Sequence, residues 1–157
     1  MLTPDSLTRI DREIAKYPAT QRQSAVMAAL AIAQEEQGWL SPETIEFVAD
    51  YLGMPPIAAY EVASFYSMYN LQPIGRYKIT VCTNLPCMLS GAVDAGEYLM
   101  DKLGIGYNET TRDGKYTLEQ GQCMGACDGA PVMLVNNRRM CNSMLPEQID
   151  KLLAELE

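Results

Sequence analysis

The sequence of 157 residues contains no histidine. This absence excludes Ser-His-Asp and Cys-His catalytic machinery, Rieske centres, zinc sites with histidine ligands and haem held by histidine. Thiolates and carboxylates are the side chains that remain for metal or redox chemistry.

Basic residues and long apolar runs are also scarce. Twelve Lys and Arg against twenty Asp and Glu give a net charge of -8, so we expect no nucleic-acid partner. The longest nearly apolar run, 25–33, is far too short to span a membrane, and the N-terminus lacks the basic and apolar regions of a signal peptide. We therefore expect a cytoplasmic protein without direct membrane insertion.

Residues 1–72 carry signals for helices only. The four expected helices start at Thr3-Pro4, at Thr20 with Gln23 as a capping box, at Ser41-Pro42 and at Pro55-Pro56. Pro18, Gly38 and Gly53 end the first three. In the fourth, the bulky residues are Ile57, Tyr60, Val62, Phe65 and Tyr66. This half is predicted to be a small helical bundle.

Residues 73–157 change to a strand-type pattern. Strands are predicted over 77–81, 115–119, 131–135 and 138–142, with turns at Asp113-Gly114 and Asn136-Asn137. Helices are predicted over 88–103 and from Pro146 onward. The order of these elements indicates an α+β domain with a mixed four-stranded sheet.

Four of the five cysteines form two short pairs. Cys82 and Cys87 are separated by four residues, and Cys123 and Cys127 by three, and each pair follows a predicted strand. Because cytosolic thiols stay reduced, metal binding or thiol chemistry is favoured over disulfides. The fifth cysteine, Cys141, lies in a predicted strand and is expected to pack in the core.

Four thiolates suit either zinc or an iron-sulfur cluster. Structural zinc sites usually contain C-x2-C, whereas a binuclear cluster accepts wider loops, and neither pair here is C-x2-C. The spacing also disfavours a thioredoxin-type dithiol. An iron-sulfur cluster is thus the favoured interpretation, with a zinc-stapled interaction module and a thiol-redox enzyme using Cys123 or Cys127 as the alternatives.

The segments VCTNLPC (81–87) and GQCMGACDGAP (121–131) resemble the ligand loops of a known family, the thioredoxin-like 2Fe-2S subunit of respiratory complex I, the NADH:quinone oxidoreductase of bacteria. The segments GWLS (38–41) and ASFYSMY (63–69) are similar to that family's N-terminal motifs. The resemblance therefore covers nearly the whole chain.

The resemblance implies that Cys82, Cys87, Cys123 and Cys127 bind one 2Fe-2S cluster in a thioredoxin-like ferredoxin domain. It implies a flavin-bearing partner subunit that binds FMN and oxidises NADH, and single-electron exchange between the cluster and that FMN. It needs no catalytic acid or base in this chain. Further peripheral-arm subunits, and a place at the cytoplasmic face of the inner membrane through the complex, are also implied.

The same module occurs in related enzymes. The small subunits of NAD-dependent formate dehydrogenases and bidirectional hydrogenases look similar, and the ligand loops do not separate them from complex I. The helical half carries more apolar and aromatic residues than a bundle of that size can bury, so we expect a heteromeric partner and self-association of the isolated chain.

Overall fold

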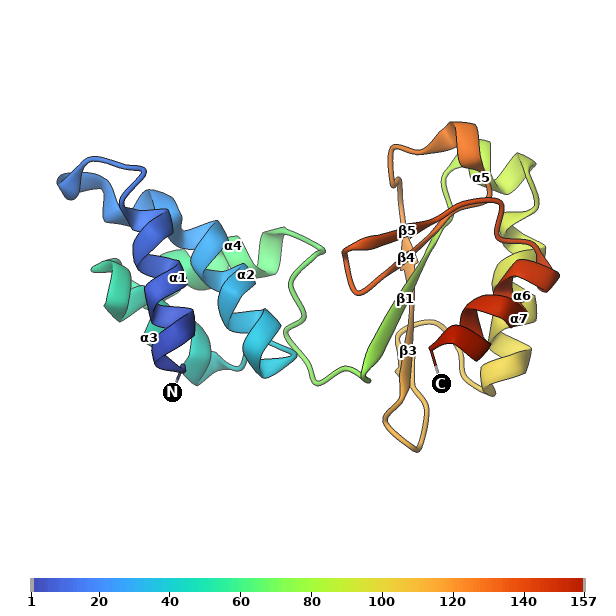
Figure 1. Ribbon diagram of the computed structural model, residues 1–157, viewed down its shortest axis with the longest axis horizontal. Helices are drawn as coiled ribbons and strands as arrows, with labels where there is room; N and C mark the ends of the chain where they lie inside the picture. Colours follow the sequence, from blue (N-terminus) through green and yellow to red (C-terminus); the bar gives the residue numbers. More distant parts are fainter. Residues whose placement is uncertain (1, 157) are drawn as a thin grey trace. The chain divides into compact units, whose positions relative to one another are not determined.

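The computed structural model describes residues 2–156, and the contacts within the chain divide it into two units, Met1–Pro73 and Ile74–Glu157. Each unit has its own hydrophobic core. The first unit contains helices alone, and the second contains all the strands (Figure 1).

The N-terminal unit consists of α1 (Pro4–Ile14), the 3-10 helix η1 (Ala19–Ala25), α2 (Val26–Gln37), α3 (Pro42–Leu52) and α4 (Pro56–Phe65). Two of the predicted helix starts are confirmed by hydrogen bonds. Thr3 Oγ1 accepts from the Ser6 amide at 3.3 Å, and Ser41 Oγ accepts from the Thr44 amide at 3.2 Å. Gly53 ends α3 in the left-handed conformation that glycine adopts without strain.

The predicted capping box at Thr20 is wrong. This segment forms η1 after Pro18, without a side-chain cap, and α2 begins only at Val26. The backbone of Gln21 is non-helical, with φ -124° and ψ 34°, so the segment does not continue as one α-helix.

Helix α4 buries small residues, and of its large residues only Val62 packs against the core within residues 2–156. Its buried residues are the small Ala59 and Ala63, whereas Ile57, Tyr60 and Phe65 are exposed, Phe65 to 80%. Small side chains allow α4 to approach its neighbours closely, and the large side chains are left on the outer face. Sequence alone does not distinguish these faces, because both are apolar.

Tyr69 anchors the end of this unit in its core. Its hydroxyl donates to the Met27 carbonyl at 2.8 Å, and burial raises the pKa of Tyr69 to about 12. Since the folded state favours the protonated phenol, the contribution of the Tyr69 hydroxyl to stability is complete below the ordinary pKa of 10.0 and is lost as pH rises toward about 12.

We expect Tyr69→Phe to lower the free energy of unfolding by about 1 kcal/mol at neutral pH, measured by urea unfolding. The loss should shrink above pH 10, and a loss that is constant with pH would contradict it.

The C-terminal unit contains a five-stranded sheet in the order β2-β3-β1-β4-β5. Strands β1 and β3 are parallel, and the other neighbours are antiparallel. The strands are β1 (Tyr77–Cys82), β2 (Glu109–Thr110), β3 (Tyr116–Gly121), β4 (Met133–Val135) and β5 (Arg139–Cys141). The predicted α+β class with a mixed sheet is confirmed, but the sheet has one strand more than the four expected, because the short first arm of the Asp113-Gly114 hairpin pairs as β2.

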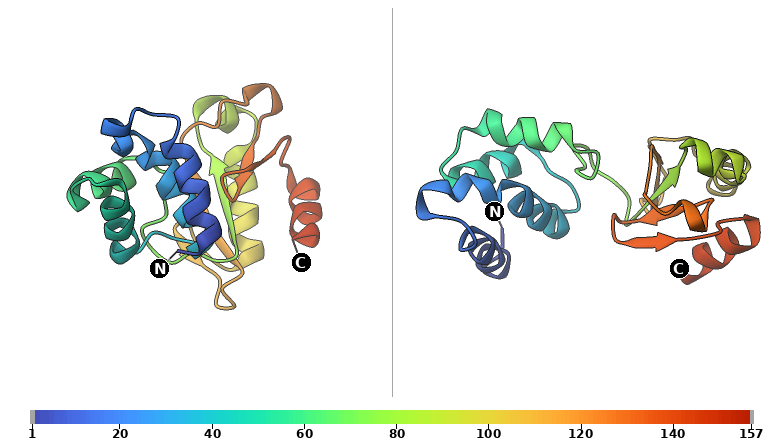
Figure 2. Two further views of the ribbon diagram at one scale, coloured as in Figure 1. Left: turned by 60° about the vertical axis from the view of Figure 1, so that its left-hand side comes forward. Right: turned by 90° about the horizontal axis from the view of Figure 1, so that it is seen from above.

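Helices α6 (Ala92–Leu103) and α7 (Pro146–Glu155) lie together on one face of this sheet, as the view from above shows (Figure 2). Their apolar sides cover a core of strand and helix residues that includes Ile79, Val81, Leu99, Leu118 and Ile149. The single helix predicted over 88–103 is wrong. Gly91, at φ 95°, separates the short α5 (Leu85–Leu89) from α6.

Among the helices of residues 2–156, none has both the length and the apolar character that crossing a lipid bilayer requires.

Candidate cluster site

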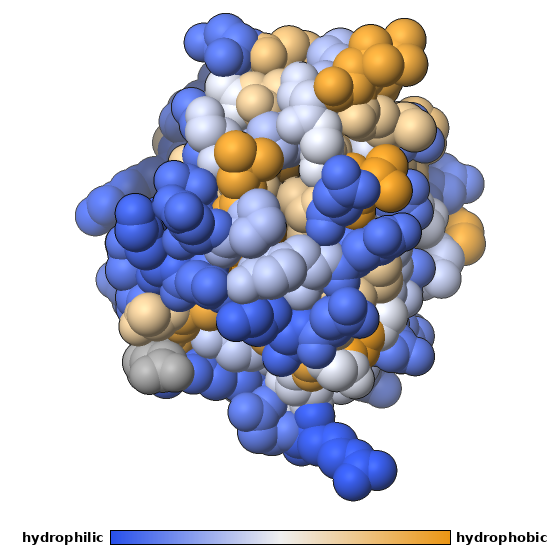
Figure 3. All heavy atoms as spheres, turned by 90° about the vertical axis from the view of Figure 1, so that its right-hand side faces the viewer, coloured by the Kyte–Doolittle hydropathy of each residue, from blue (hydrophilic) through white to orange (hydrophobic). Residues whose placement is uncertain are grey.

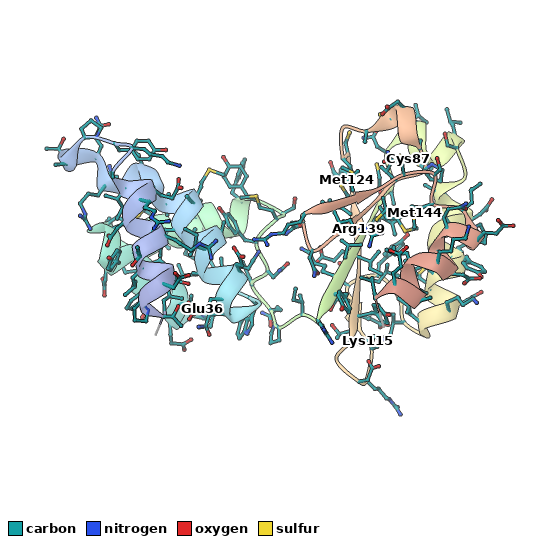
Figure 4. The ribbon with its side chains drawn as sticks, in the orientation of Figure 1. Glu36, Cys87, Lys115, Met124, Arg139 and Met144 are labelled. Carbon is teal, nitrogen blue, oxygen red and sulfur yellow. The ribbon has the colours of Figure 1, made fainter. Side chains whose placement is uncertain are left out.

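The two cysteine loops leave the same end of the sheet. Cys82 is the last residue of β1 and pairs in register with Gly121, the last residue of β3. Because these neighbouring strands are parallel, the loops that follow them start side by side. Figure 4 shows Cys87 and Met124, one from each loop, at the end of the unit opposite Lys115.

The first loop turns directly into α5. The Asn84 side-chain oxygen accepts from the Leu85 amide at 2.9 Å, and Pro86 occupies the first turn, where a missing N–H costs nothing. This start places Cys87 on the inner side of α5. Both Cys82 and Cys87 are buried, at 2% and 1% exposure.

Hydrogen bonds join the first loop to the second. The Gly121 carbonyl accepts from the amide of Thr83 at 2.8 Å and from its hydroxyl at 3.0 Å. The Cys82 thiol lies 3.5 Å from the Gln122 carbonyl. These contacts fix the starts of the two loops relative to each other.

The second loop is more open. Cys123 and Cys127 are both exposed, and Cys127 begins the 3-10 turn η2 (Cys127–Gly129). The far end of the loop is tied down, since the Gly129 carbonyl accepts from the Ser143 amide at 2.7 Å. The loop is therefore held at both ends, with two accessible thiols between them.

The surroundings of Cys87 change the pKa of its thiol. Burial raises the pKa of its thiol, and the neighbouring Cys82 and Cys127 raise it further, while a backbone hydrogen bond involving Val132 lowers it. Since the ordinary pKa of 9.0 already lies above neutral pH, raising it favours the protonated thiol at neutral pH. A bound metal would supply positive charge and favour the thiolate.

The structure brings the four predicted ligands together only in part. Cys87 interacts electrostatically with Cys82 and Cys127, although Cys127, like Cys123, is exposed. Within residues 2–156, no three or more Cys, Asp or Glu side chains are arranged to hold a metal ion. The donor set fits an iron-sulfur cluster nonetheless, because it offers four soft thiols on two loops that start side by side.

Cys141 belongs to a different part of the molecule. It is buried in the core under α6 and α7, opposite Met133 in the sheet, and burial raises the pKa of its thiol. This placement confirms the predicted packing role.

An apolar surface beside Cys87 was missed by sequence reasoning. We define the α5 patch as four exposed side chains, namely Leu85, Met88, Leu89 and Val93, of which Leu89 is 81% exposed. Figure 3 shows hydrophobic surface gathered toward the α5 end of the unit. The signal was present in the sequence, because a chain of net charge -8 has no charged residue between Lys78 and Asp94.

Comparisons with known proteins agree with this architecture. The family model of the thioredoxin-like 2Fe-2S ferredoxin matches residues 10–157. One subunit of the NADH-quinone oxidoreductase of Rickettsia felis is 45% identical over 90% of this chain and 85% of its own length. Another relative, from the NADH-quinone oxidoreductase of Thermus thermophilus, is 40% identical over 94% of this chain and 81% of its own.

Among solved structures, the NAD+-reducing NiFe hydrogenase in the air-oxidised state matches with a TM-score of 0.72 and 22% sequence identity. The match covers 89% of this chain but only 24% of the hydrogenase chain. At this identity the match shows the shared fold alone.

Proposed function

Because this chain belongs to the thioredoxin-like 2Fe-2S ferredoxin family, we propose that it is the electron-transfer subunit of an NADH-quinone oxidoreductase. The observation that carries the proposal is the common origin of the two cysteine loops at the ends of the paired strands β1 and β3. The names of relatives at 40% to 48% identity support the choice of enzyme complex.

We assign the cluster ligands to Cys82, Cys87, Cys123 and Cys127. When bound, a 2Fe-2S cluster takes up and releases one electron at a time, here in exchange with FMN on the NADH-oxidising partner subunit. This chain supplies two buried thiols, Cys82 and Cys87, and two exposed thiols on the second loop, Cys123 and Cys127. No residue of this chain is required as a general acid or base.

The α5 patch supports a protein partner at this end of the unit. Exposed apolar side chains without interspersed charge are typical of surfaces that become buried in a complex. Since electrons cross only short distances between proteins, the partner that exchanges them must bind near the cysteine loops. We assign the α5 patch to the contact with the flavin-bearing subunit.

The exposed apolar face of α4 supports contact with a further subunit of the peripheral arm. We also propose that residues 1–72 and 73–157 are separate domains, in keeping with the change from helices alone to a sheet. The complex would hold the chain at the cytoplasmic face of the inner membrane.

Metal analysis of the full chain, purified without oxygen, tests the proposed function. We expect iron and acid-labile sulfide in equal amounts and no stoichiometric zinc. Zinc without iron or sulfide would contradict the proposal and favour a zinc-stapled interaction module.

A further inference from the structure

Gly121, the last residue of β3, is closely surrounded by other side chains. A Cβ atom at this position would lie 2.7 Å from the Thr80 side-chain methyl and would also overlap the methyl group of Met124. Gly121 does not need glycine for a left-handed backbone, because the positive-φ glycines are others. The position needs glycine because a neighbouring side chain already fills the space above it.

Met124 is that neighbouring side chain. It packs against the small apolar cluster formed by Cys82, Cys87, Ala92 and Val132. From Gly121 to Gly129 it is the only large apolar residue. Within the second loop, Met124 and the smaller Ala126 pack against this cluster, while the two thiols of the loop remain exposed.

The hydrogen bonds that hold this loop lie at its ends. Thr83 binds the Gly121 carbonyl, and Ser143 binds the Gly129 carbonyl. Met124 lies between these anchors, next to Cys123, and it is the larger of the two side chains, with Ala126, by which the middle of the loop packs against the buried thiols.

We propose that Met124, which packs over Gly121, is a positioning residue of the cysteine site. Its side chain shields the Cys82 and Cys87 thiols from solvent and holds the second cysteine loop close to the first. The role of this shielding rests on the proposed function, because apolar side chains around the ligands control how easily water reaches a bound cluster. The shielding of Cys82 and Cys87 by Met124 does not require a cluster, so it can be tested in the metal-free chain.

The experiment measures the alkylation rate of each cysteine by iodoacetamide in the reduced, metal-free full chain, followed by peptide mass spectrometry. We expect Met124→Ala to accelerate the reaction of Cys82 and Cys87 about tenfold, because truncation opens a cavity over them. Gly121→Ala should act in the same direction, since its methyl group displaces Met124. Met124→Leu should stay within about twofold of the unmodified chain, because it keeps the apolar volume.

Two controls distinguish the loss of shielding by Met124 from a general destabilisation of the fold. Cys141 lies in the other core of the same unit, so its rate should not change. Met27→Ala removes an exposed methionine of α2, in the N-terminal unit, and should leave every rate unchanged.

Unchanged rates at Cys82 and Cys87 in Met124→Ala would overturn the inference, as would an equal acceleration at Cys141. Because the assay contains no iron, its outcome does not depend on the proposed function, whose failure would appear in the metal analysis.

Discussion

Replacing Cys127 with alanine should abolish cluster binding without unfolding the chain. Cys127 is exposed at the start of a short turn, so its side chain contributes little to the core. As a ligand, however, it would complete the coordination of one iron. Since loss of even a supporting residue weakens metal binding about 10- to 100-fold, loss of a ligand should weaken iron retention by more than about 100-fold. Iron content and the visible absorption spectrum measure the effect.

Cys141→Ser is the matched control for this prediction. It also removes one thiol, but from the core under α6 and α7. We expect unchanged iron content and an unchanged spectrum, with only a modest loss of stability from a hydroxyl in apolar surroundings. Equal loss of iron in both variants would contradict the ligand assignment, as would full retention of iron in Cys127→Ala.

Leu89→Asp should break the contact with the flavin-bearing subunit. Leu89 is the most exposed member of the α5 patch, so the substitution leaves the fold of the free chain intact. In the complex it would place a carboxylate in an apolar contact, at a cost of about 3 kcal/mol, which corresponds to roughly 100-fold weaker binding. Titration calorimetry with the purified partner subunit measures the change in dissociation constant.

The control for this variant adds the same residue elsewhere. Lys115→Asp makes the chain still more acidic, but Lys115 lies at the opposite end of the unit from Cys87 (Figure 4). Binding close to that of the unmodified chain is expected. If Lys115→Asp weakens binding as strongly as Leu89→Asp, net charge rather than the α5 patch governs the contact.

The sequence predicted most elements whose signals are local. Thr3, Ser41 and Gly53 marked helix ends correctly, because capping depends on one side chain and its nearest amides or on the freedom of one glycine. The alternation in 77–81 likewise predicted β1. The family resemblance is confirmed by the match over residues 10–157.

Features that depend on packing were missed. Gly91 divides the helix predicted over 88–103, but a glycine within an apolar pattern does not reveal its own φ. The orientation of α4 depends on how closely its neighbours approach, which periodicity does not encode. The need for glycine at Gly121 likewise depends on packing, because it follows from the positions of the Thr80 and Met124 side chains.

The sequence predicted which residues belong to the candidate site, but it did not predict how they are arranged or which of them are buried. The spacing of the cysteines indicated which thiols belong together, and the structure places their loops at one end of the sheet. Which thiols are buried could not be predicted, because burial of Cys87 follows from the turn into α5. The ligand set remains a prediction.

Low-temperature electron paramagnetic resonance of the dithionite-reduced full chain tests the central claim most directly. A reduced 2Fe-2S centre is paramagnetic, so we predict a signal from about one spin per chain that is absent in Cys127→Ala and present in Cys141→Ser. A folded, iron-replete preparation that gives no signal on reduction would contradict the account.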